Sequence, residues 1–118
     1  MRSQSYEQVL TKNGVQWEYM PQIRVDYIDV RKSQNNQARL INPINEELIT
    51  RYALMDKEGF EAPAVVLWRS GKGKWNTIDG NQRIQVKVKH RHEFTDAYVV
   101  YNTDPKVIYR LTCTFNNQ

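Results

Sequence analysis

Cysteine, histidine and long apolar runs are scarce in this chain of 118 residues. Its single cysteine, Cys113, excludes an internal disulfide framework and fits a reducing compartment. Cys113, His90 and His92 are the only soft metal ligands, and their positions do not match the spacing of a zinc site. No apolar run approaches the roughly 18 residues of a membrane span, and no signal-peptide core is present. We therefore expect a soluble, cytoplasmic protein without a membrane partner.

Familiar catalytic motifs are missing as well. The sequence has no Gly-Lys-Ser/Thr of a P-loop and no Ser-His-Asp order at a nucleophile elbow. Its length suits one domain with one core. A net charge of +4 and a pI near 9.3 allow a polyanionic partner without requiring one. The basic runs at 69–74 and 83–91 fit a solvated surface or contacts to phosphates, through Lys87, Lys89 and Arg91 in the second run.

The order of apolar and turn-forming residues predicts a small α+β domain over residues 1–118. Lys12-Asn13-Gly14 between two apolar segments predicts a β-hairpin within residues 1–20. A strand is expected after Pro21, followed by a polar loop at 31–38. Capping residues and helical spacing predict a helix at about 46–58. Further strands are expected at 64–68, 74–78 and 96–101, and a helix at 105–116.

The segment 84–90 has two interpretations. Ile84, Val86 and Val88 alternate with polar residues, which favours a strand. Ile84 and Val88 also stand four residues apart, which suits a helix. The alternating pattern alone favours the strand.

The stretch Asp79-Gly80-Asn81-Gln82-Arg83 is the most informative local feature. A glycine at this junction lets the backbone approach a ligand, and the amide groups that follow can point at an anion. The guanidinium of Arg83 is a planar set of donors suited to a phosphate. Asp-Gly is equally a common ordinary turn, so the stretch alone is a weak signal.

The order of elements, with this stretch in its middle, resembles the N-terminal domain of the ParB/sulfiredoxin-like superfamily, of phage or plasmid type. Many of its phage and plasmid members carry Asp-Gly-Asn-His-Arg where this chain has Asp79–Arg83. An earlier Gln-Pro-Arg of the family matches Gln37-Ala38-Arg39, and a late Glu-Asn-x-Gln matches 115–118. The resemblance implies a helix at about 81–90, against the alternating pattern.

The resemblance further implies a nucleotide-binding domain that takes CTP or ATP with Mg²⁺ in a DNA-partition or DNA-regulatory protein. Asp79 would be the metal ligand. The implied nucleotide-binding residues are Gln37, Arg39, Gly80, Asn81, Gln82, Arg83 and Asn116. Family members continue into a helix-turn-helix DNA-binding domain, which would follow residue 118, and a nucleotide can drive formation of a homodimer.

Two departures from the family pattern favour binding over turnover. Asn81 replaces the glutamate of the partition-type proteins, and Phe115 replaces an acid in the last motif. Both changes remove carboxylates that could hold Mg²⁺. Two alternatives remain open: a phosphotransferase or nuclease, with Asp79 and Arg83 as catalytic residues, and a protein-interaction domain whose nucleotide site has decayed.

Overall fold

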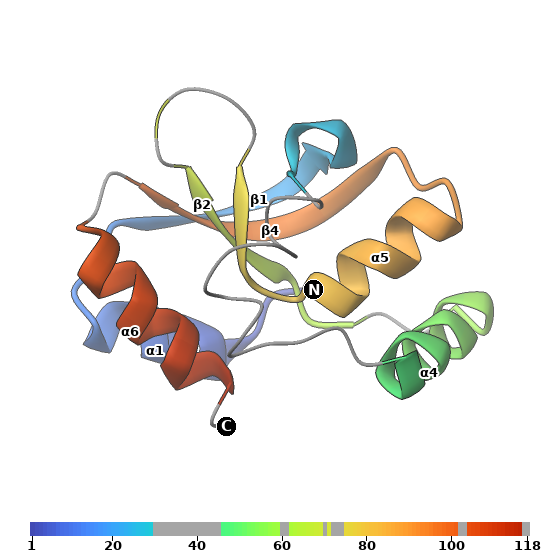
Figure 1. Cartoon of the computed structure of the whole chain (residues 1–118), viewed down its shortest axis with the longest axis horizontal. Coiled ribbons are helices and arrows are strands. Elements are labelled where there is room, and N and C mark those ends of the chain that lie inside the picture. Colours follow the sequence, from blue (N-terminus) through green and yellow to red (C-terminus); the bar gives the residue numbers. More distant parts are fainter. Residues whose placement is uncertain (30–45, 60–61, 70, 72–74, 102–103, 117–118) are drawn as a thin grey trace.

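A four-stranded mixed sheet lies between two groups of helices (Figure 1). The structure is a computed structural model that describes residues 1–29, 46–59, 62–69, 71, 75–101 and 104–116. The described α-helices are α1 (Gln4–Lys12), α4 (Glu46–Lys57), α5 (Asn81–Lys89) and α6 (Pro105–Asn116). The α+β class expected from the sequence is confirmed.

The strands follow the order β1-β4-β2-β3 across the sheet. Their bounds are β1 (Trp17–Arg24), β2 (Val65–Arg69), β3 (Asn76–Asp79) and β4 (Phe94–Tyr101). Strand β4 pairs antiparallel with β1 and parallel with β2, while β2 pairs antiparallel with β3. Helix α5 therefore starts at the end of an edge strand, directly after β3.

Both faces of the sheet are covered, as Figure 1 shows. Val66, Tyr98 and Val100 belong to a core cluster with Leu10 of α1 and Leu111 of α6. The alternate residues of the same strands point to the other face, where they form a second cluster with Ile84 of α5; they are Val65, Leu67, Ala97 and Val99. Burial on both faces explains the nearly continuous apolar run at 64–68, and the strand expected there is confirmed.

The hairpin expected within residues 1–20 is wrong. Ser3 caps α1 by accepting a hydrogen bond from the backbone N–H of Tyr6, and Asn13 caps its C-terminus. Gly14 follows with φ of 70°, the left-handed conformation that ends many helices. Asn-Gly marks a helix end here, because the same left-handed preference serves a helix stop and a hairpin turn.

The strand expected after Pro21 is only partly correct. Strand β1 runs from Trp17 through Pro21 to Arg24, and Val25–Tyr27 then forms a 3₁₀ turn. The proline is tolerated because β1 is an edge strand whose register with β4 shifts between Met20 and Ile23.

The three expected helices are confirmed as α4, α5 and α6. The strand interpretation of 84–90 is wrong. Ile84 and Val86 are buried, whereas Val88 is 48% exposed, so the three alternating apolar residues do not share one buried face. Gly80, in the left-handed conformation, turns the chain at the end of β3, and α5 begins directly after it. The alternation of apolar and polar residues at 84–90 gives no indication of this turn.

We expect Leu10→Ala to lower the free energy of unfolding by about 2–5 kcal/mol, because Leu10 is fully buried in the core. Urea denaturation measures the loss. Gln8→Ala is the matched control, since Gln8 is exposed on the same helix and alanine favours helices. A clear loss of stability in the control would contradict a helical α1, because alanine disfavours strands.

Candidate functional site

Gly80 joins β3 to α5 in a conformation that other residues adopt only with strain. Its φ is 105°, and a Cβ atom there would lie 2.6 Å from Cγ1 of Val65 and 3.0 Å from Nη2 of Arg83. The first turn of α5 contains no acid, and its N-cap has no side chain. The positive end of the helix dipole is therefore uncapped by a side chain within α5.

Arg83 is buried and bonded to protein groups around it. Its Nη2 donates to Oδ2 of Asp79 at 2.8 Å and to the hydroxyl of Tyr6 at 3.3 Å. Its Nη1 donates to the backbone carbonyls of Pro63 and Ala64. One guanidinium thus connects α5, the end of β3, α1 and the segment that leads into β2.

The surroundings of Arg83 and Tyr6 keep the first charged and the second neutral. Burial of Arg83 works against its charge, but Asp79 and then Tyr6 outweigh that effect, so the pKa of Arg83 is raised. Burial also raises the pKa of Tyr6 to about 12. Tyr6 is therefore neutral at physiological pH and donates its hydroxyl proton to Asp79 Oδ2 at 2.9 Å.

A cavity of about 570 Å³ lies next to Arg83, between α4, α5, β1 and β4. Its cationic lining residues are Arg2, Arg83 and Lys87, and its acidic ones are Asp56 and Asp96. Apolar and aromatic groups complete it, among them Tyr19, Tyr52, Met55, Val65, Val86 and Phe94. The volume is in the range of roughly 300–1,000 Å³ that small-molecule sites occupy.

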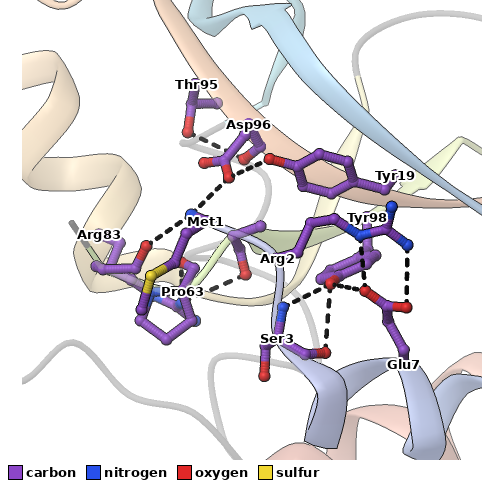
Figure 2. Close-up of polar contacts among 12 residues, drawn as sticks. Met1, Arg2, Ser3, Glu7, Tyr19, Pro63, Arg83, Thr95, Asp96 and Tyr98 are labelled. Carbon is purple, nitrogen blue, oxygen red and sulfur yellow. Dashed lines mark hydrogen bonds and ion pairs between the residues drawn. The ribbon is translucent and has the colours of Figure 1, made fainter.

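Met1 and Arg2 of the N-terminal segment line this cavity. Figure 2 shows the polar contacts that hold this segment in place. The amino group of Met1 pairs with Oδ2 of Asp96 at 2.6 Å. Arg2 donates two hydrogen bonds to the carboxylate of Glu7. The hydroxyl of Tyr98 donates a further hydrogen bond to Oε2 of Glu7 at 2.6 Å. Arg2 is thereby held between the cavity and α1.

The expected nucleotide-binding residues are only partly described. Gly80, Asn81, Gln82 and Arg83 lie together at the start of α5, and all four are buried. Oδ1 of Asn81 has no hydrogen-bond partner among the described residues, although Asn81 is 3% exposed. Gln37 and Arg39 lie outside the described residues. Asn116 is the last residue of α6, and its side chain is likewise outside the description.

The side chains predicted to contact phosphates or a metal ion differ in solvent exposure and in the bonds they already make. Lys87 is half-buried and lines the cavity, whereas Lys89 and Arg91 are exposed. Asp79, expected as a metal ligand, uses Oδ2 to accept from Tyr6 and Arg83. A carboxylate already neutralised by a guanidinium is a poor ligand for Mg²⁺. The catalytic roles of Asp79 and Arg83 stay predictions.

Sequence reasoning missed a cluster of Asp56, His90 and His92. Both imidazoles contact the same carboxylate oxygen, Oδ2 of Asp56, at 2.6 Å and 2.8 Å. From the sequence, His90 and His92 do not match the spacing of a zinc site, because the third residue of the cluster, Asp56, lies on a different helix. A His-x-His pair at the end of a helix is the signal that could have drawn attention to it.

Comparison of the chain with protein-family models and with curated proteins finds no match. Within the described ranges, none of the helices is long and apolar enough to cross a membrane.

We expect Arg83→Ala to lower the free energy of unfolding by about 3–5 kcal/mol, because it removes a buried guanidinium and leaves the partly buried carboxylate of Asp79 without its charged partner. Urea denaturation measures the change, with Arg110→Ala on the exposed side of α6 as control. Adding Asp79→Ala to the Arg83 variant should restore part of the loss. Strictly additive losses would show that the two groups do not act as a pair.

The Glu7 carboxylate should make the protein sensitive to acid. Hydrogen bonds from Arg2, then from Tyr98, lower the pKa of Glu7 below its ordinary value of 4.5. A lowered pKa in the folded state gives stability that is present above the ordinary value and is lost as the pH falls through the folded value. The melting temperature of the wild type should therefore exceed that of Glu7→Gln at about pH 7, and this difference should shrink below 4.5.

The exposed residue Glu58 supplies the reference for this comparison, since Glu58→Gln also removes one carboxylate. A difference between wild type and the Glu7 variant that stays constant across the acid range would contradict the assignment.

Proposed function

We propose that this chain is a cytoplasmic nucleotide-binding domain of ParB-like type that acts in DNA partition or DNA regulation. The phosphates of CTP or ATP bind at the start of α5 and in the adjoining cavity. The observation that carries the proposal is the cavity itself, which is lined by three cationic side chains, Arg2, Arg83 and Lys87, the last two from α5. The cavity by itself indicates an anionic ligand. The resemblance of the Asp79–Arg83 stretch to the ParB/sulfiredoxin-like superfamily indicates that this anion is a nucleotide.

The balance of charge supports an anionic ligand. Asp96 is paired with the amino group of Met1, and Asp56 is bonded to two histidines. The two acids of the cavity are thus both engaged. The ammonium group of Lys87 makes no hydrogen bond or close ion pair among the described residues, although its charge, after the hydrogen bond from His90, helps to lower the pKa of Asp56, so it can contact a phosphate in the cavity.

Arg83 supports the ligand in a different way from the one its position in the sequence suggests. Its hydrogen-bond donors are largely used by Asp79, Tyr6 and two carbonyls. Arg83 therefore contributes positive electrostatic potential to the site more than bidentate hydrogen bonds to a phosphate. Direct contacts to phosphate then fall to Lys87 and to the backbone N–H groups at the start of α5. The buried amide of Asn81, with its unpartnered oxygen, lies at this same helix end.

Magnesium enters this proposal with the nucleotide. Because Asp79 is neutralised by Arg83, the ion would be coordinated mainly by phosphate oxygens and water, as Mg²⁺ commonly is. The same pairing argues against Asp79 as a general base, and binding therefore ranks above turnover.

DNA contacts and assembly complete the proposal. Exposed Lys89 and Arg91 lie at the C-terminal end of α5 and would meet the DNA backbone weakly and in a salt-dependent way. Site-specific contacts would come from a helix-turn-helix domain that follows the present sequence. Two copies that close over a nucleotide would form the dimer.

Thermal shift with CTP, ATP, GTP and UTP, each with and without Mg²⁺, tests the proposal. A nucleotide at 100 times its dissociation constant stabilises the fold by about 2.7 kcal/mol, which raises the melting temperature by several degrees. If no nucleotide raises it, the proposal fails and a protein-interaction domain becomes the better explanation.

Lys87→Ala and Lys89→Ala form a matched pair for locating the ligand. Both remove one positive charge from α5, but Lys87 lines the cavity and Lys89 is exposed. We expect the first to weaken nucleotide binding by about tenfold and the second to leave it nearly unchanged, because salt screens an exposed charge. Equal losses in both variants would place the nucleotide outside the cavity.

A further inference from the structure

Three potential metal ligands meet where α4 packs against the C-terminal end of α5. Nδ1 of His90 and Nε2 of His92 approach Oδ2 of Asp56 at 2.6 Å and 2.8 Å. All three ligand atoms lie within 4.8 Å of one another. The side chains are partly exposed, at 24% for Asp56, 19% for His90 and 40% for His92, so an ion can reach them from solvent.

The turn at the end of α5 is what brings the two imidazoles together. The N–H of His92 donates to the carbonyl of Lys87, and the N–H of Arg91 donates to the carbonyl of Val88. These two bonds define a Schellman motif, in which Arg91 takes the left-handed position with φ of 58°. Glycine usually occupies that position, because other residues adopt it at a cost. The chain therefore keeps a strained residue at the point that folds His92 back beside His90.

We propose that Asp56, His90 and His92 bind a divalent transition-metal ion of the zinc class. Two imidazole nitrogens and one carboxylate oxygen are ligands that Zn²⁺ favours, and three protein ligands leave a fourth position for water. Asp56 also lines the cavity, so the proposed site lies at the edge of that space.

The geometry requires little change to admit the ion. With Zn–N and Zn–O bonds of about 2.0–2.2 Å, tetrahedral ligand atoms stand roughly 3.3 Å apart. The present separations of 2.6 Å and 2.8 Å are those of hydrogen bonds that carry a proton between each pair of atoms. A metal ion replaces those protons, and small rotations of partly exposed side chains open the required space.

The plain alternative is that the cluster only fastens α4 to α5 by hydrogen bonds. One histidine bonded to the carboxylate would suffice for that role. Here two imidazoles approach the same carboxylate oxygen, an arrangement in which all three side chains can bind one ion. The metal proposal is independent of the nucleotide proposal and is tested without any nucleotide.

The test is a titration of the chain, without a histidine tag and stripped of metal, with ZnCl₂ and then CoCl₂. We expect one ion per chain, a melting temperature raised by several degrees at saturation, and the visible absorption of tetrahedral Co²⁺. Asp56→Asn, His90→Ala and His92→Ala should each weaken Zn²⁺ binding at least tenfold. Glu58→Gln, an exposed carboxylate two residues from Asp56, should bind like the wild type.

Two results would overturn the proposal: no binding to the wild type, or equal binding to the wild type and to all three ligand variants. The second would assign the ion elsewhere, for example to Cys113. If a variant fails to fold, ¹⁵N spectra of the wild-type imidazoles replace it. Zn²⁺ that shifts the ring nitrogens of His90 and His92 supports the site, and unchanged ring signals at saturating Zn²⁺ refute it.

Discussion

The ion pair between buried Arg83 and partly buried Asp79 is the contact on which the arrangement of the domain depends. Arg83 reaches the segment that leads into β2 through two carbonyls and reaches α1 through Tyr6, while Asp79 ends β3. One guanidinium thus connects α1, the segment that leads into β2, the end of β3 and α5. Such a pair stabilises only while all its partners stay in place, since removal of one partner leaves a charge without water. It therefore specifies the position of α5 more than it adds to the net free energy of folding.

The sequence predicts the class of fold and most elements, because those elements carry local signals. Helix α4 has its helical spacing, and β2 has a continuous apolar run. The errors occur where one local signal serves two structures. Asn13-Gly14 suits both a hairpin and a helix stop, and the spacing from Ile84 to Val88 suits both a strand and a helix. Only packing decides: α1 buries Leu10 in the core, and α5 covers Val65 and Leu67.

The candidate sites are harder to predict than the fold, for physical reasons. The Asp79–Arg83 stretch is recognisable in the sequence, but the internal bonds of Arg83 depend on Tyr6, 77 residues away. The Asp56 cluster depends on a contact across 34 residues. It also needs a left-handed turn at an arginine, for which the sequence offers no glycine as a signal. Contacts of this kind arise from tertiary structure, which periodicity does not encode.

One face of α5 holds three groups that the two proposals use. Arg83, Lys87 and His90 follow at i, i+4 and i+7, so they form a single row along the helix, and the Schellman turn adds His92 at its end. Arg83 and Lys87 line the cavity together with Asp56 of α4, and His90 contacts that same carboxylate. A phosphate near Lys87 would carry the opposite sign to an ion held at Asp56. The two ligands would therefore favour each other electrostatically, because each supplies the charge that the other lacks. The short polar row on α5, more than the Gly80 turn alone, is thus the feature of the fold on which function would depend.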